Sequence, residues 1–184
     1  MKRRFAALAA TLTLALSSPS AAETDAAAAR AAFARAVPVF QHPRCVNCHT
    51  RAEGPRAGNT PRPHIPPVLR GAAGRGDGAE PCGGCHKDRN TAGGSIPGAP
   101  TWRMPEPGRS GWDGLTPAQI CAALKDPARN SRLSPDQMVE HMTRDPLVLW
   151  AWEPGGIRTK PPLAHADFVA LLRAWYAGGA PCPG

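Results

Sequence analysis

Two copies of one five-residue motif constrain this chain more than any other feature. Residues 45–49 read Cys-Val-Asn-Cys-His, and residues 82–86 read Cys-Gly-Gly-Cys-His. Two thiols one helical turn apart can add to the two vinyl groups of one porphyrin, and the histidine that follows supplies an imidazole to the iron. Each motif therefore predicts one covalently attached haem c. The predicted attachment and proximal residues are Cys45, Cys48, His49, Cys82, Cys85 and His86.

The same cysteines also fit a less favoured chemistry. Two Cys-x-x-Cys pairs have the donor atoms for Zn²⁺ bound by four thiolates. The histidine directly after each second cysteine is unnecessary for such a site. An exported chain also enters an oxidising compartment, which disfavours free thiolates. Haem attachment is therefore the preferred interpretation.

The N-terminus reads as a secretory signal peptide. Lys2, Arg3 and Arg4 form a positive region, residues 5–16 form a short apolar stretch, and residues 20–22 offer a cleavage site of small residues. The apolar stretch is too short for a typical membrane span, although an uncleaved anchor stays open as an alternative. We expect a signal peptide over residues 1–22, a single dihaem domain over residues 23–184, and export to the periplasm.

The positive charge of the chain fits the same hypothesis. The formal net charge is +8, and aromatic residues make up only 5% of the chain. Signal cleavage removes three basic residues, and the four propionates of two haems would nearly cancel the remainder. The composition therefore indicates arginines that pair with propionates or keep the protein in solution, rather than a nucleic-acid interface.

Two cysteines lie outside the motifs. Cys121 falls on the apolar side of a short predicted helix, and Cys182 follows the last predicted helix. An even remainder in an exported protein predicts a disulfide between them, which would pin the C-terminus to the body of the protein. Two unpaired thiols are the disfavoured alternative.

The C-terminal half contains clear helix starts. Thr116 and Ser134 each precede a proline and stand three residues before a glutamine, so each opens a predicted helix with a capping box. These helices run to about residues 125 and 143, and Asp145-Pro146 starts one or two further turns. A last helix is predicted from the apolar spacing of residues 168, 171, 172 and 175 and ends at Gly178. An Ala-rich helix is predicted over residues 25–36.

Two long segments show no such periodicity. Residues 51–80 and 93–111 are dominated by glycine, proline and arginine, and no stretch of the chain alternates as a strand. We expect a mostly α fold: a compact dihaem cytochrome c with short helices and long Gly/Pro-rich loops wrapped around the haems. Because the predicted polypeptide core is small, the haems would supply much of the apolar interior.

A haem that only transfers electrons needs a second axial ligand, since six-coordination keeps the iron geometry nearly constant between its two oxidation states. His64 is the first candidate, because four prolines within three residues on either side restrict its backbone. The alternative is an exposed loop histidine.

The second candidate is His141, which follows Met138 by about one turn on a predicted helix. A buried histidine hydrogen-bonded to a carbonyl is its alternative. Met104 is the main rival ligand, and Met142 is adjacent to His141. His42 lies only three residues before Cys45 and is awkwardly placed to reach the opposite face of its own haem, and His165 more plausibly begins the last helix.

Several phrases carry a resemblance to a known family. They are residues 44–49 (Arg-Cys-Val-Asn-Cys-His), 97–102 (Pro-Gly-Ala-Pro-Thr-Trp), 120–121 (Ile-Cys), 126–130 (Asp-Pro-Ala-Arg-Asn) and 147–155 (Leu-Val-Leu-Trp-Ala-Trp-Glu-Pro-Gly). Over roughly residues 40–183 the chain resembles small exported dihaem c-type cytochromes labelled as an isoquinoline 1-oxidoreductase subunit. The resemblance implies an electron acceptor beside a molybdenum hydroxylase, an enzyme that oxidises N-heterocycles or aldehydes with water as the oxygen source.

The resemblance also bears on the axial ligands. In that family the positions of His64 and His141 are histidines, whereas the position of Met104 need not be methionine. Residues 110–112 (Ser-Gly-Trp) depart from a Met-containing phrase of the family, which argues against a methionine ligand there. The resemblance therefore implies two haems that each have two histidine ligands.

The expected function is electron transfer, with no catalytic residue of the chain's own. The expected partners are redox proteins, and the resemblance adds a molybdenum hydroxylase to them. We expect no nucleic-acid partner and no stable membrane span after signal cleavage. The alternative is a haem enzyme or sensor with one open distal site. Nothing in the sequence resembles a peroxidase site, and the chain is short for a dihaem peroxidase.

Overall fold

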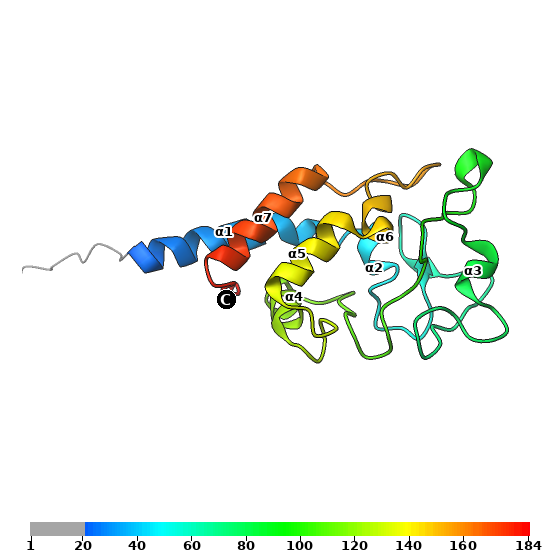
Figure 1. Cartoon of the computed structure of the whole chain (residues 1–184), viewed down its shortest axis with the longest axis horizontal. Coiled ribbons are helices and arrows are strands. Elements are labelled where there is room, and N and C mark those ends of the chain that lie inside the picture. Colours follow the sequence, from blue (N-terminus) through cyan, green and yellow to red (C-terminus); the bar gives the residue numbers. More distant parts are fainter. Residues whose placement is uncertain (1–20) are drawn as a thin grey trace, which may run out of the picture.

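A computed structural model describes residues 21–184, so the predicted signal peptide lies outside the described residues except for its last two positions. The fold is mostly α-helical, as predicted (Figure 1). Within the described part of the chain, no helix combines the length and apolar character needed to cross a membrane. The elements in chain order are α1 (Ala21–Phe40), α2 (Pro43–Val46), β1 (Arg56–Ala57), β2 (Arg62–Pro63), α3 (Cys82–Cys85), the 3₁₀ turn η1 (Ala92–Gly94), α4 (Pro117–Lys125), α5 (Pro135–Arg144), α6 (Pro146–Trp150) and α7 (His165–Ala177).

The first helix is longer than predicted and belongs to a true polypeptide core. α1 and α7 run side by side, and α4 and α5 flank them (Figure 1). Small residues permit this close approach: Ala29 and Ala36 are buried on α1, and a Cβ at Gly178 would collide with the Cβ of Ala29.

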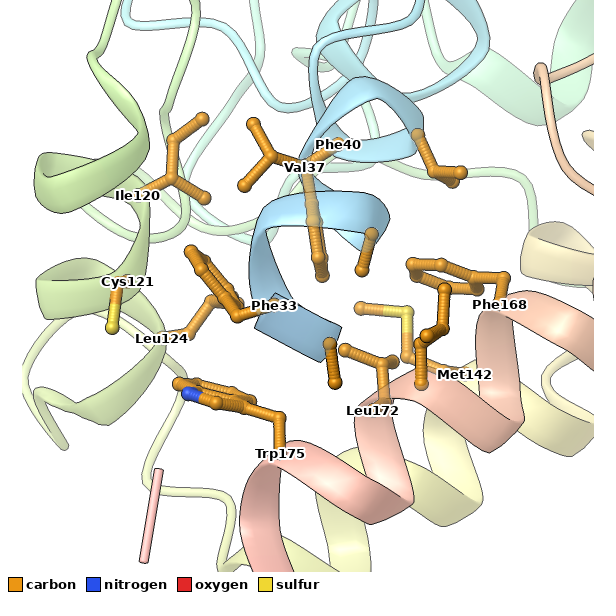
Figure 2. Close-up of a cluster of buried hydrophobic side chains, with 14 of the residues drawn as sticks. Phe33, Val37, Phe40, Ile120, Cys121, Leu124, Met142, Phe168, Leu172 and Trp175 are labelled. Atoms are coloured by element: carbon orange, nitrogen blue, oxygen red, sulfur yellow. The ribbon is translucent and has the colours of Figure 1, made fainter. Parts of the chain in front are cut away.

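Aromatic rings fill the space between these helices. Phe33 packs on Trp175 with ring centres 4.7 Å apart, and Phe40 meets Phe168 edge-on at 5.3 Å. Figure 2 shows these side chains pointing toward one another from α1 and α7, with Ile120 of α4 beside them. The expectation of a small polypeptide core was therefore wrong for the helical half of the molecule, which α1, α4, α5 and α7 form. The reason is that the Ala-rich face of α1 carries large apolar residues at helical spacing.

The predicted helix starts are confirmed. The Thr116 hydroxyl accepts a hydrogen bond from the backbone N–H of Gln119 at 3.3 Å, and the Gln119 amide oxygen accepts from the Thr116 N–H at 2.9 Å. Ser134 and Gln137 form the same capping box at the start of α5. These contacts lie within three residues, so local sequence is sufficient to specify them.

The predicted Cys121–Cys182 disulfide is present. The two Cα atoms lie 5.6 Å apart, and Cys121 is fully buried on α4 among the core residues. The bond joins α4 to the segment after α7, so the C-terminus is tied to the helical half as expected.

The half of the molecule that contains residues 51–111 has little regular structure. β1 and β2 form a minimal antiparallel hairpin, with Arg56 opposite Pro63, which the sequence did not predict. Each strand has only two residues, which is too few to show the alternation of apolar and polar residues that predicts a strand. A buried arginine holds these loops instead: Arg70 donates to the carbonyls of Thr50 at 2.6 Å, Ala52 at 2.9 Å and Pro105 at 3.0 Å. Its guanidinium satisfies backbone oxygens that no helix or strand pairs.

Candidate functional site

Each Cys-x-x-Cys-His motif forms one helical turn. In the first, the carbonyl of Cys45 accepts a hydrogen bond from the N–H of His49 at 2.9 Å; in the second, the carbonyl of Cys82 accepts from the N–H of His86, also at 2.9 Å. This turn places the two cysteines of a motif on one side of the backbone and the histidine at its end. The four motif cysteines are free thiols.

Two adjoining cavities open beside the motifs. We call them the His86 cavity, of about 620 Å³, and the His49 cavity, of about 660 Å³. Both volumes fall within the range of about 300–1,000 Å³ usual for ligand and cofactor sites. Residues that line both cavities are Arg44, Cys48, Arg103, Met104 and Trp150, so the two spaces share a wall.

The cavities contain the predicted residues in a crossed arrangement. The His86 cavity is lined by the second motif and by His64, which follows the first motif in sequence. The His49 cavity is lined by the first motif and by His141 of α5. The structure therefore brings each predicted distal histidine to a motif, and it assigns His64 to the motif that the sequence order would not suggest.

The motif histidines are held in the same way. His49 Nδ1 donates to the carbonyl of Ser110 at 2.8 Å, and the ring stacks on Trp112 at a centre distance of 3.9 Å. His86 Nδ1 donates to the carbonyl of Pro97 at 2.7 Å, and its ring stacks on Trp102 at 4.5 Å. A proton fixed on Nδ1 leaves the Nε2 lone pair free to bind a metal.

Electrostatics favour the neutral form of both rings. Burial lowers the pKa of His49 to about 3, although the hydrogen bond with Ser110 opposes that shift. Burial also lowers the pKa of His86, with the hydrogen bond to Pro97 again opposing it. Both imidazoles are therefore unprotonated at Nε2 near neutral pH, as metal ligation requires.

The two distal candidates follow the same pattern. His64 Nδ1 donates to the carbonyl of Pro66 at 2.8 Å, and its ring centre lies 5.9 Å from that of His86. His141 Nδ1 lies 3.2 Å from Asp145 Oδ2. Within residues 21–184, no hydrogen bond engages the Nε2 atom of these two histidines or of the two motif histidines. All four rings are only partly exposed.

The remaining candidates differ in this respect. His42 uses both ring nitrogens, since Nδ1 accepts from the Arg44 N–H at 3.2 Å and Nε2 lies 3.4 Å from Thr159 Oγ1. His165 Nε2 is hydrogen-bonded to the carbonyl of Met142 at 2.8 Å. Met104 is buried at the wall between the cavities, where it lies near both.

Asp145 is an ionised partner of His141. Burial raises its pKa, but hydrogen bonds from His141 and from the Leu147 N–H, together with the charge of Arg103, outweigh burial and lower the pKa to about 2. Arg103 Nη2 lies 3.1 Å from the same Oδ2 atom. The Asp145 carboxylate also caps α6 through Leu147 at 2.8 Å.

The cavity walls contain unpaired polar atoms. Among the described residues, the buried side-chain atoms without a hydrogen-bond partner are Arg44 Nε, Asn47 Oδ1 and Asn130 Oδ1. All three residues line a cavity. Buried polar atoms usually have partners, so the unpaired Arg44 Nε donor is consistent with a carboxylate of a cofactor beside it, whereas the two unpaired amide oxygens are acceptors and need a donor. Thiol pairs, free imidazole nitrogens and several arginines together fit a haem c in each cavity.

Sequence reasoning missed the residues that hold the motif histidines. Pro97 and Trp102 serve His86, and Ser110 and Trp112 serve His49. The sequence held one clue to these residues. Each pair comes from a short segment that ends in tryptophan: residues 97–102 for His86 and residues 110–112 for His49. From the sequence alone, both segments bear only on the family resemblance.

The donor groups do not converge as a zinc site requires. Within residues 21–184, no three histidine, cysteine or acidic side chains form a group that could hold a metal ion. The four-thiolate alternative therefore has no geometric support.

Comparison of the chain with family models, with curated proteins and with solved structures gives no match in any of the three.

Proposed function

We propose that the mature protein is an exported dihaem c-type cytochrome that transfers electrons. One haem would be attached to Cys82 and Cys85 in the His86 cavity and the other to Cys45 and Cys48 in the His49 cavity. The observation that carries the proposal is the presence of two histidine pairs, each beside a Cys-x-x-Cys turn, whose Nδ1 atoms are engaged and whose Nε2 atoms are free.

The chain's own residues have distinct tasks in this proposal. His86 and His64 would ligate one iron, and His49 and His141 the other. The carbonyls of Pro97 and Ser110, with the stacked indoles of Trp102 and Trp112, keep the motif imidazoles at one orientation, which lowers the cost of reorganisation. When bound, haem iron accepts and releases one electron at a time.

Arginines supply the countercharge. Arg44, Arg103 and Arg158 line the His86 cavity, and Arg44 and Arg103 also line the other. Guanidinium groups suit carboxylates through paired N–H donors, so these side chains would meet the haem propionates. This accounts for a basic composition without invoking nucleic acid.

The proximity of the cavities supports exchange of electrons within one chain. Cys48 lines both cavities, and its pKa is raised by burial and, to a smaller extent, by the nearby Cys82 of the other motif. Attachment sites this close favour rapid transfer between two haems. A haem enzyme or sensor would instead need one cavity without a second ligand, whereas each cavity here has a second histidine.

The partner is proposed from resemblance alone. The likeness to isoquinoline 1-oxidoreductase subunits supports electron acceptance from a molybdenum hydroxylase. Reduction of the purified oxidised protein by such an enzyme and its N-heterocyclic substrate tests this; no reduction across several such enzymes argues against the partner while leaving electron transfer intact.

Intact mass tests the haem proposal. The full chain is expressed with a c-type maturation system, and the denatured protein is expected to exceed the mature polypeptide by two haem masses. The matched variant Cys82→Ser/Cys85→Ser is expected to carry one haem. A wild-type mass equal to that of the bare polypeptide would overturn the proposal.

A further inference from the structure

We propose that Asp145 makes the haem of the His49 cavity the lower-potential centre, so that electrons pass from that cavity to the His86 cavity. This inference rests on the proposed function. Asp145 is a positioning residue in this scheme, because it acts on the iron only through His141.

The four histidines differ in one respect. Three of them give their Nδ1 hydrogen to a neutral backbone carbonyl, at Pro97, Ser110 and Pro66. His141 alone among the four faces a carboxylate, with Nδ1 3.2 Å from Asp145 Oδ2. The asymmetry therefore lies in the partners of the two distal ligands.

A carboxylate acceptor changes the ligand. It draws the Nδ1 proton toward itself and makes Nε2 a more basic donor to the metal. A more basic ligand stabilises the oxidised iron more than the reduced iron, and second-shell hydrogen bonding is one of the protein's means of adjusting haem potential. The haem bound by His141 is thus expected to be harder to reduce.

The general charge of the surroundings does not separate the two centres. In the described lining of each cavity, arginines outnumber carboxylates by three. Arg103, which weakens the field of Asp145 by pairing with it, lines both cavities. What differs is position: Asp145 contacts the ligand itself, and its side chain is only 14% exposed, so solvent screens it little.

The exposed position of the second motif agrees with electron flow from the His49 cavity to the His86 cavity. In the second motif Cys82 is partly buried, but Gly83, Gly84 and Cys85 are exposed; in the first motif Cys45 and Cys48 are partly buried, and the two residues between them are buried. The His86 cavity therefore has its attachment turn at the surface, where an electron can leave for an acceptor. With a haem in each cavity, the internal step would move one electron from one iron to the other, with no bond made or broken and no proton transferred.

Asp145→Asn is the direct test, read by spectroelectrochemical titration of the purified holoprotein. Asparagine is as good an N-cap as aspartate, so α6 retains its start. The substitution removes the negative charge of the carboxylate that faces His141. We expect the lower of the two midpoint potentials to rise and the higher one to stay constant. The control Asp136→Asn removes the same charge from an exposed position on α5 and is expected to move neither. A shift of the higher potential, equal shifts of both, or no shift would overturn the inference.

A second measurement does not depend on the folding of that variant. In His64→Ala, the haem that stays low-spin is the one in the His49 cavity, and it is expected to titrate near the lower wild-type potential. In His141→Ala, the remaining low-spin haem is expected near the higher one. The reverse assignment would overturn the inference. Absence of covalent haem would instead defeat the proposed function, so the two failures are distinguishable.

Discussion

The imidazole rings of His64 and His86 lie 5.9 Å apart, centre to centre, with their planes inclined at 62°. His64 belongs to the loop that follows the first motif, and His86 ends the second motif. The first motif's loop thus reaches across to the second motif, and the two proposed haem sites interlock. Each site would depend on a segment that the other site organises.

His64→Ala is expected to convert one haem, and only one, from low spin to high spin, because the His86 cavity would lose its second axial ligand. Absorption and electron paramagnetic resonance spectra measure the change, and added imidazole is expected to restore the low-spin form. His165→Gln serves as the control, since the Nε2 of His165 is already hydrogen-bonded to Met142. Two low-spin haems in His64→Ala would remove His64 from the ligand set.

His141→Ala is expected to convert the other haem to high spin, whereas Met104→Leu is expected to leave both haems low-spin. The reason is that His141 has a free Nε2 in the His49 cavity and an oriented Nδ1, while Met104 is buried in the shared wall. Absorption and electron paramagnetic resonance spectra of the two variants measure the spin state of each haem. A high-spin haem in Met104→Leu, with none in His141→Ala, would mean one His/Met haem and a different direction of electron flow.

Alkylation of denatured, unreduced protein is expected to leave Cys121 and Cys182 unlabelled. The double variant Cys121→Ala/Cys182→Ala is expected to lose about 2–4 kcal/mol of unfolding free energy, because the bond closes a long loop of chain. Denaturant unfolding measures the loss. Hydrogen exchange is expected to rise more in α7 than in the loops beside the motifs, and a uniform rise would contradict the proposed role of the bond.

Arg70→Met is expected to destabilise the protein by about 2–3 kcal/mol, because the buried carbonyl of Thr50 and the partly buried carbonyls of Ala52 and Pro105 would lose their donor. Methionine retains most of the apolar stem, so packing changes little. The control Arg173→Met, at an exposed position on α7, is expected to change stability by no more than about 0.5 kcal/mol. Equal effects of the two substitutions would show that Arg70 does not hold the loops.

Several features were predictable from the sequence because they depend on contacts within a few residues. The motif turns, the capping boxes at Thr116 and Ser134 and the N-cap at Asp145 each join atoms no more than four positions apart. The Cys121–Cys182 bond joins distant residues, yet it followed from counting, since the motifs account for every other cysteine.

Other features depended on contacts that no local pattern encodes. The crossed pairing of His64 with His86, the indoles stacked on both motif histidines and the second role of Asp145 beside His141 all join segments separated by loops. Those loops are rich in glycine and proline and lack periodicity, so the sequence carries no signal of where they lead. Residue chemistry alone determined which side chains can ligate a metal. The path of the loops decided which of these side chains lie close together, and long-range hydrogen bonds such as those of Arg70 hold that path.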